Sequence, residues 1–144
     1  MIHLTRRYRF SASHRLHVAT LDDQENRRLY GKCNNPFGHG HNYELEISVC
    51  GPVNPWSGQV ADVDRLDALM REQVLEPFDH KYLNTQLDPF DSVAPTSENI
   101  GWELCRRLKR NWASAFAGDW PRLEKVRIAE TPRNIFEVSA DEVE

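Results

Sequence analysis

The chain has 144 residues, of which 40% are hydrophobic and 28% charged, and these proportions indicate a single globular domain over residues 1–144. Its net charge of −4 disfavours a general nucleic-acid binder and a protein attracted to anionic membranes. Three cysteines are an odd number for a disulfide framework and favour a reducing, cytoplasmic location. No apolar run is long enough to span a bilayer, so we expect neither nucleic acid nor membrane as a partner.

The charge is distributed unevenly along the sequence. Residues 1–33 hold seven Lys/Arg and three Asp/Glu, whereas the remainder holds eleven Lys/Arg and nineteen Asp/Glu. One interpretation is scatter over a solvated surface. The other is a local basic rim that attracts an anionic substrate.

The N-terminal segment is predicted to be a half-buried strand over residues 2–10. Its apolar residues of one parity are Ile2, Leu4, Tyr8 and Phe10. If the strand continues without a bulge, His14 falls on the same buried side. Residues 17–32 are polar and charged, and we read them as a long loop or a short helix.

A second strand is predicted from about His39 to Val49. Its odd-numbered residues from Tyr43 onward are apolar, and His39 and His41 share their parity. Both histidines therefore face inward with the apolar row.

Two helices and two more strands follow. The first helix starts after Asp62 and stops at Pro77, the second starts near Thr96 or Ser97 and extends to Trp112, and residues 78–93 between them are a loop. Strands are expected over about 123–130 and 134–138. The order ββααββ predicts an α+β fold in which an antiparallel four-stranded sheet carries two helices on one face.

Three histidines are candidate metal ligands. His14, His39 and His41 share inward parity on two strands, and three neutral imidazoles with an open position are what a catalytic zinc ion needs. Zinc is preferred to iron because no carboxylate completes a local facial triad. The alternative for each histidine alone is a hydrogen-bonded residue in or near the core.

Five further residues have two interpretations each. Cys33 lies in a polar loop before the histidines, where it is a buried small residue or a catalytic thiol. Asp79 and His80 are an ordinary loop pair or a proton relay. Glu130 points to the apolar side of its strand, where it forms a salt bridge with an arginine or accepts two N–H bonds from a planar donor. Glu98 has the same two readings, with a helix-cap role as its simpler explanation.

Several motifs in order resemble the 6-pyruvoyl-tetrahydropterin synthase family, which has the tunnelling fold. The resemblance covers Tyr8 to about Val138. The motifs are Phe10-Ser11-Ala12-Ser13-His14-Arg15-Leu16, Gly31-Lys32-Cys33-Asn34-Asn35-Pro36, Gly38-His39-Gly40-His41-Asn42-Tyr43, Phe78-Asp79-His80-Lys81-Tyr82-Leu83-Asn84, Thr96-Ser97-Glu98-Asn99 and Glu130-Thr131.

The resemblance implies roles for these residues. It implies Zn²⁺ held by the three histidines His14, His39 and His41. It implies a catalytic relay of Cys33, Asp79 and His80, with the Asp-His pair supplied across a subunit interface. Glu130 would anchor the pterin ring, and Glu98, Thr96 and Ser97 would line the same pocket. The family also implies a homohexamer of two stacked trimers that encloses a β-barrel.

The implied reaction is that of a lyase that converts 7,8-dihydroneopterin triphosphate to 6-pyruvoyl-tetrahydropterin and releases triphosphate. Candidates for holding the triphosphate are Arg15, Arg27, Arg28 and Lys32. One alternative is the related 6-carboxytetrahydropterin synthase of queuosine (deazapurine) biosynthesis, whose members have a shorter gap between the cysteine and the His-x-His pair. Another is a non-catalytic pterin-binding hexamer.

Overall fold

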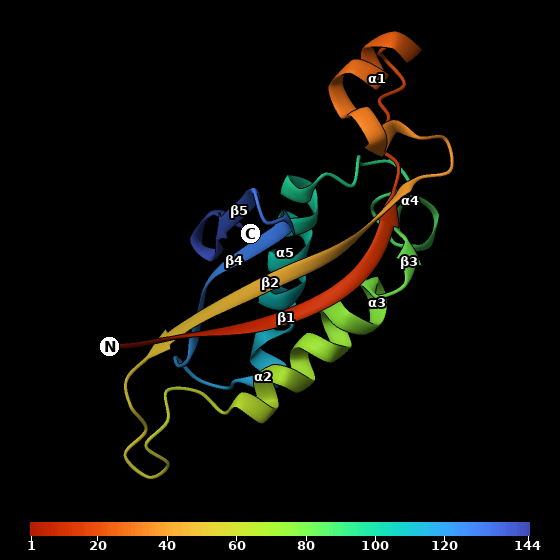
Figure 1. The fold of residues 1–144 in the computed structure, drawn as a ribbon. Helices are drawn as coiled ribbons and strands as arrows, with labels where there is room; N and C mark the ends of the chain where they lie inside the picture. Colours follow the sequence, from red (N-terminus) through yellow and green to blue (C-terminus); the bar gives the residue numbers. More distant parts are fainter.

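The computed structural model describes residues 1–144 as one curved sheet covered by helices on one face (Figure 1). The strands are β1 (Ile2–His14), β2 (His39–Gly51), β3 (Lys81–Tyr82), β4 (Arg122–Thr131) and β5 (Asn134–Ser139). The helices are α1 (Asp23–Tyr30), α2 (Val63–Met70), α3 (Glu76–Phe78), α4 (Leu83–Gln86) and α5 (Ser97–Ala115).

The sheet has five strands in the order β3-β1-β2-β4-β5, rather than the four predicted. The four long strands pair antiparallel, as expected, and β1 and β2 pair over their whole length from Ile2↔Gly51 to His14↔His39. The short β3 pairs parallel to β1, which makes the sheet mixed. This strand and α4 lie in the segment that we predicted to be a loop, because a two-residue strand leaves no periodic signal in the sequence.

Residues 17–32, for which a long loop and a short helix were both considered, contain the helix α1. The Asp22 carboxylate caps α1 by accepting from the Glu25 N–H at 2.8 Å. The fully buried Asn26 side chain accepts from the Val18 N–H and donates to the carbonyls of Val18 and Leu21. Figure 1 shows α1 projecting beyond the end of the sheet.

The helix that follows β2 begins where Asp62 was expected to cap it. It does not stop at Pro77 but passes through a wider π-type turn over Arg71–Leu75 and ends with α3 at Phe78. Pro77 lies directly after the π-type turn, where the regular α-helical hydrogen bonding is already interrupted. Thr96 caps α5 by accepting from the Asn99 N–H at 3.2 Å, as predicted.

The core lies between the sheet and α2 and α5. Alternate residues of β2 are fully buried against the two helices, among them Leu45 and Ile47, together with Leu104 of α5 and Ile128 of β4. The opposite face of the sheet is polar and carries cross-strand ion pairs such as Arg7–Glu46 and Lys125–Glu137. No helix is both long and apolar enough to cross a membrane.

Candidate active site

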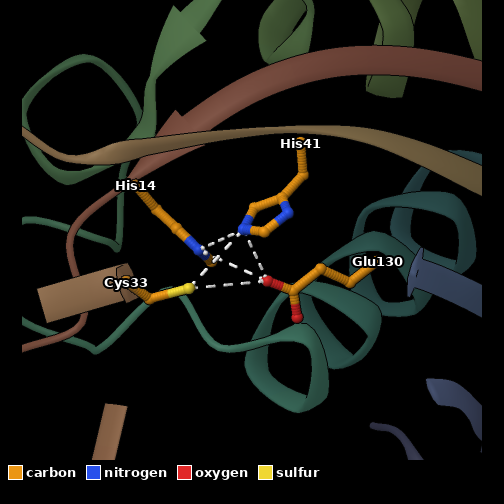
Figure 2. A group of neighbouring side chains, drawn as sticks. All are labelled: His14, Cys33, His41 and Glu130. Carbon is orange, nitrogen blue, oxygen red and sulfur yellow. Dashed lines mark hydrogen bonds and ion pairs between the residues drawn. The ribbon is translucent and has the colours of Figure 1, made fainter. Parts of the chain in front are cut away.

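Four side chains from separate parts of the chain converge where β1 ends and β2 begins (Figure 2). They are His14 of β1, Cys33 of the turn after α1, His41 of β2 and Glu130 of β4, and their ligand atoms all lie within 4.8 Å of one another. Nε2 of His14 and Nε2 of His41 are 3.1 Å apart. We call these four residues the first cluster.

The strand pairing explains why the histidines meet. His14 pairs with His39 and Ala12 with His41 across β1 and β2, so alternate residues at this end point to the helix-covered side. Gly38 permits the close approach, because it has φ +85° and a Cβ there would come within 3.2 Å of the His14 carbonyl. The inward parity predicted for His14, His39 and His41 therefore matches the strands.

His14 is fully buried, and its ring is fixed on the side away from the cluster. Its Nδ1 lies 2.8 Å from the Pro95 carbonyl oxygen and 3.3 Å from the Tyr43 hydroxyl. Since a carbonyl only accepts, Nδ1 is the donor to Pro95, and Nε2 is directed into the cluster. This is the outer-shell support typical of a metal-binding histidine. No sequence pattern indicated Pro95, because its contact is made through the backbone.

Glu130 binds both imidazoles. Its Oε1 is 2.7 Å from His41 Nε2 and 3.4 Å from His14 Nε2, and its Oε2 accepts from the Ser97 hydroxyl at 2.8 Å. The hydrogen bonds to His14 and His41 hold the pKa of this carboxyl well below its usual range. Glu130 has no partner residue in β5, because the β4–β5 register shifts between Ala129 and Thr131. Such bulges redirect side chains next to functional sites.

Cys33 completes the cluster from a short 3₁₀ turn over Gly31–Asn34. Its Sγ lies 3.6 Å from His41 Nε2 and 4.0 Å from Glu130 Oε1. The turn is tied to the chain after β1, because Leu16 N–H donates to the Cys33 carbonyl and the Asn34 amide donates to the Leu16 carbonyl, both at 2.7 Å. Burial, and secondarily the Glu130 charge, raises the pKa of the thiol.

His39 stands beside the first cluster. Its ring centroid is 4.7 Å from that of His41, but its nitrogens lie outside the group of four ligand atoms. It lines a neighbouring surface pocket of about 390 Å³ together with Arg15, Arg27, Lys32 and Asp23. We call this the basic pocket. A basic rim was one of the two interpretations of the uneven charge distribution, and the basic pocket is where it would lie.

The other predicted site residues are placed elsewhere. Asp79 accepts from the Ser11 N–H at 2.8 Å and from His80 Nδ1 at 2.9 Å, and the Ser11 bond followed by His80 lowers its pKa. The His80 side chain is 82% exposed and its backbone has φ +58°, in the left-handed region. Glu98 is exposed on the first turn of α5. Arg28 is paired with Glu25 and does not line the basic pocket.

The comparisons with known proteins agree with this geometry. The sequence profile of the family described as 6-pyruvoyl tetrahydropterin synthase matches residues 3–141. This chain belongs to that family. It is 40% identical over 136 residues to the 6-pyruvoyl tetrahydrobiopterin synthase of Poecilia reticulata, covering 92% of this chain and 86% of the relative. The human enzyme of the same name is 39% identical over 132 residues, with coverage of 92% and 87%.

A solved structure extends the agreement to three dimensions. The Caenorhabditis elegans 6-pyruvoyl tetrahydropterin synthase superposes with a TM-score of 0.83 at 39% identity, covering 96% of this chain and 94% of that one. The fold and the family are therefore established together, and the candidate site can be interpreted chemically.

Proposed function

We propose that this protein is a zinc-dependent lyase that converts 7,8-dihydroneopterin triphosphate to 6-pyruvoyl-tetrahydropterin and releases triphosphate. The observation that carries the proposal is the first cluster, in which two imidazoles, a thiol and a carboxylate converge within 4.8 Å in a chain of this family. Each group suits one task of that reaction, namely metal binding, proton transfer or pterin recognition.

The donor set fits zinc. His14 presents its Nε2 with its Nδ1 fixed by the Pro95 carbonyl, His41 presents its Nε2 3.1 Å away, and His39 is the third imidazole on the same side of β2. A zinc ion bound there would polarise the hydroxyls of the substrate side chain and acidify the adjacent C–H bond. The protein supplies the rest through residues around the three histidines.

Glu130 is suited to hold the pterin ring. The aminopyrimidinone edge offers two parallel N–H donors, which a carboxylate can accept together. Ser97, only 2% exposed, fixes one oxygen of Glu130 and thus orients the carboxylate. Thr96 and Glu98 flank Ser97 at the start of α5, where we place them at the margin of the same pocket.

The basic pocket is suited to the triphosphate. Arg15, Arg27 and Lys32 line it against a single carboxylate, Asp23, and His39 links it to the first cluster. Guanidinium groups bind phosphate oxygens in pairs, so Arg15 and Arg27 can restrain the leaving group while Lys32 contributes charge. This narrows the four candidate basic residues to three, without Arg28.

Cys33 is suited to accept a proton from a substrate carbon. Because burial raises its pKa, the thiol needs a neighbouring positive charge to become a thiolate, and a bound zinc ion would provide it. The elimination transfers no electrons to an external acceptor, so no redox cofactor is needed. Asp79 and His80 are too exposed to act within the first cluster of their own chain, and we assign them to the site of an adjacent subunit.

A homohexamer built from two trimers accounts for that assignment. The helix-free face of the sheet is polar, and β5 leaves a free edge that a neighbouring chain can pair with. Three sheets joined in this way would close a barrel with the polar face inside. Sedimentation of the purified protein tests this assembly through its mass.

The reaction is tested by incubating the zinc-loaded protein with 7,8-dihydroneopterin triphosphate and identifying the products by mass spectrometry. We expect triphosphate and 6-pyruvoyl-tetrahydropterin in equal amounts. A 6-carboxy product with acetaldehyde would instead assign the protein to the 6-carboxytetrahydropterin synthases. Binding of substrate without turnover would make it a pterin-binding protein.

A further inference from the structure

A second group of potential metal ligands lies at the other end of the same strands. His3 of β1, Cys50 of β2 and Glu124 of β4 place a ring nitrogen, a sulfur and a carboxylate oxygen within 4.8 Å of one another. The His3 Nδ1 is 2.9 Å from Glu124 Oε2. We call these residues the second cluster, and nothing in the proposed reaction uses them.

The second cluster is far from the first and on the opposite face of the sheet. His3 and His14 are 11 residues apart in β1, which corresponds to roughly 36 Å of strand at about 3.3 Å per residue. His3 has the parity of Thr5 and Arg7, which line the helix-free side with Ser48 and Glu46. A metal ion held there would therefore be a separate site.

The strands assemble the second cluster in a definite way. His3 and Cys50 are direct partners in the β1–β2 register, so their side chains are adjacent on one face. Glu124 has no partner residue in β2, because the β2–β4 register shifts from Ser48↔Lys125 to Val49↔Leu123. The bulge turns this carboxylate toward the His3–Cys50 pair instead of into the core, because two residues of β4 oppose one position of β2.

The surroundings leave room for an ion. The second cluster opens into a cleft of about 600 Å³, which Asp141 and Ser139 also line. Two cations line this cleft, and both have other partners. Arg122 stacks over the Trp120 ring at 4.4 Å and donates to the Asp119 carbonyl, and Lys125 pairs with Glu137 at 3.3 Å. The cleft therefore offers two further carboxylates, Glu137 and Asp141, and space for water as additional ligands.

We propose that His3, Cys50 and Glu124 bind a second divalent transition-metal ion, with zinc as the best match to the donors. Imidazole, thiolate and carboxylate are the three protein ligands that zinc takes, at about 2.0–2.3 Å. Ligands around a tetrahedral zinc stand roughly 3.3–3.8 Å apart, a spacing that small rotations of the exposed His3 and half-exposed Glu124 side chains would reach. The ion would join β1, β2 and β4 near their shared end and stabilise the fold by binding only the folded chain.

The first experiment counts zinc ions. The full chain is stripped with a chelator, reloaded with zinc, freed of excess metal and analysed for zinc per chain. We expect two ions in the wild type and one in each of Cys50→Ser, His3→Gln and Glu124→Gln. Glu137→Gln removes a charge from the same cleft without touching the second cluster, and it should retain two. One zinc in the wild type, or an unchanged count in all three variants, would overturn the proposal.

The second experiment separates the two thiols. With cobalt in place of zinc, a cobalt–thiolate charge-transfer band reports sulfur ligation, and Cys33→Ser removes the thiol of the first cluster. We expect the band to persist in Cys33→Ser and to vanish in Cys33→Ser/Cys50→Ser, while circular dichroism shows that both remain folded. Absence of the band in Cys33→Ser would exclude Cys50 as a ligand. Both readouts are independent of catalysis, so their failure leaves the proposed lyase activity intact.

Discussion

The two ends of the sheet carry the same kinds of side chain in different settings. At one end are His14, His41, Cys33 and Glu130, and at the other are His3, Cys50 and Glu124. In both, the carboxylate comes from β4 at a register shift. The difference lies in what surrounds them. His14 is fully buried with its ring fixed by Pro95, whereas the His3 side chain is 61% exposed and its ring is bonded only to Glu124.

The contrast teaches which features make a group of ligands a reactive site. Zinc chemistry needs ligands held in place by a second layer of hydrogen bonds and an adjacent pocket for substrate. The first cluster has both, with Pro95 and Ser97 behind the ligands and the basic pocket beside them. The second cluster has donors and an open cleft, which suits a structural ion. Matched substitutions at the two ends can test this distinction.

The largest difference is expected between His14→Gln and His3→Gln. His14→Gln should remove zinc from the first cluster and lower kcat/KM by about 10³-fold or more, because metal activation of the substrate is lost. It should also reduce stability by about 1–3 kcal/mol, since the buried Pro95 carbonyl loses its donor. His3→Gln should leave turnover within about twofold. Steady-state kinetics and zinc analysis measure the activity and the metal content of the two variants. Equal losses of activity would contradict the distinction between a reactive and a structural cluster.

The thiols of the two clusters, Cys33 and Cys50, give the next largest difference. Cys33→Ala should lower kcat by about 10²–10⁴-fold, the range for loss of a general base, while zinc at the first cluster is retained. Cys50→Ser should keep wild-type kcat and lose only the second zinc. If Cys33→Ala also lost the zinc of the first cluster, Cys33 would be a ligand and not a base.

The two carboxylates of β4 should differ in substrate binding. Glu130→Gln retains one acceptor oxygen but loses the charge, so KM for the pterin substrate should rise by about 10–100-fold, the equivalent of one charge-assisted hydrogen bond. Glu124→Gln should leave KM unchanged. A fall in kcat with unaltered KM in Glu130→Gln would assign Glu130 to the chemical step instead.

Substitutions of Ser97 test whether the hydrogen bond to Glu130 orients this carboxylate for substrate binding. Ser97→Ala removes the 2.8 Å hydrogen bond that orients Glu130, and KM should rise by about 5–20-fold while kcat changes by less than about threefold. Ser97→Thr keeps a hydroxyl and should restore much of the affinity. Failure of the threonine variant to restore it, together with a lower melting temperature in both, would reduce Ser97 to a packing role.

The sequence predicts the long elements and most of the first cluster, for identifiable reasons. Alternation over β1 and β2 revealed the inward parity of His14 and His41, and the motif order revealed Cys33 and Glu130. The short β3 and the Pro95 contact could not be predicted, because two-residue pairing and backbone carbonyl positions depend on tertiary packing and leave no pattern. The second cluster escaped for the same reason, since it depends on a bulge that brings Glu124 beside Cys50.

The smallest effect on the protein is expected from a contact that lies midway along the sheet, between the two clusters, where β1 meets α2. Asp67 accepts from Arg6 at 2.6 and 2.8 Å and from the Tyr8 hydroxyl at 2.7 Å, and the Arg6 bonds lower its pKa. A carboxyl whose pKa is lower in the folded chain stabilises the fold above its unfolded value of 3.8, and this stabilisation is lost as the pH falls through the folded pKa.

Asp67→Asn should therefore lower the Tm by about 3 °C at neutral pH, and this difference should disappear as the pH falls through the folded pKa of Asp67. Glu44→Gln breaks the more exposed ion pair with Arg9 and should leave the Tm unchanged at either pH. Zinc content at both clusters should be the same in the two variants, because neither residue contacts a cluster. A Tm difference for Asp67→Asn that persists in acid would mean that packing, and not the charge, stabilises this contact.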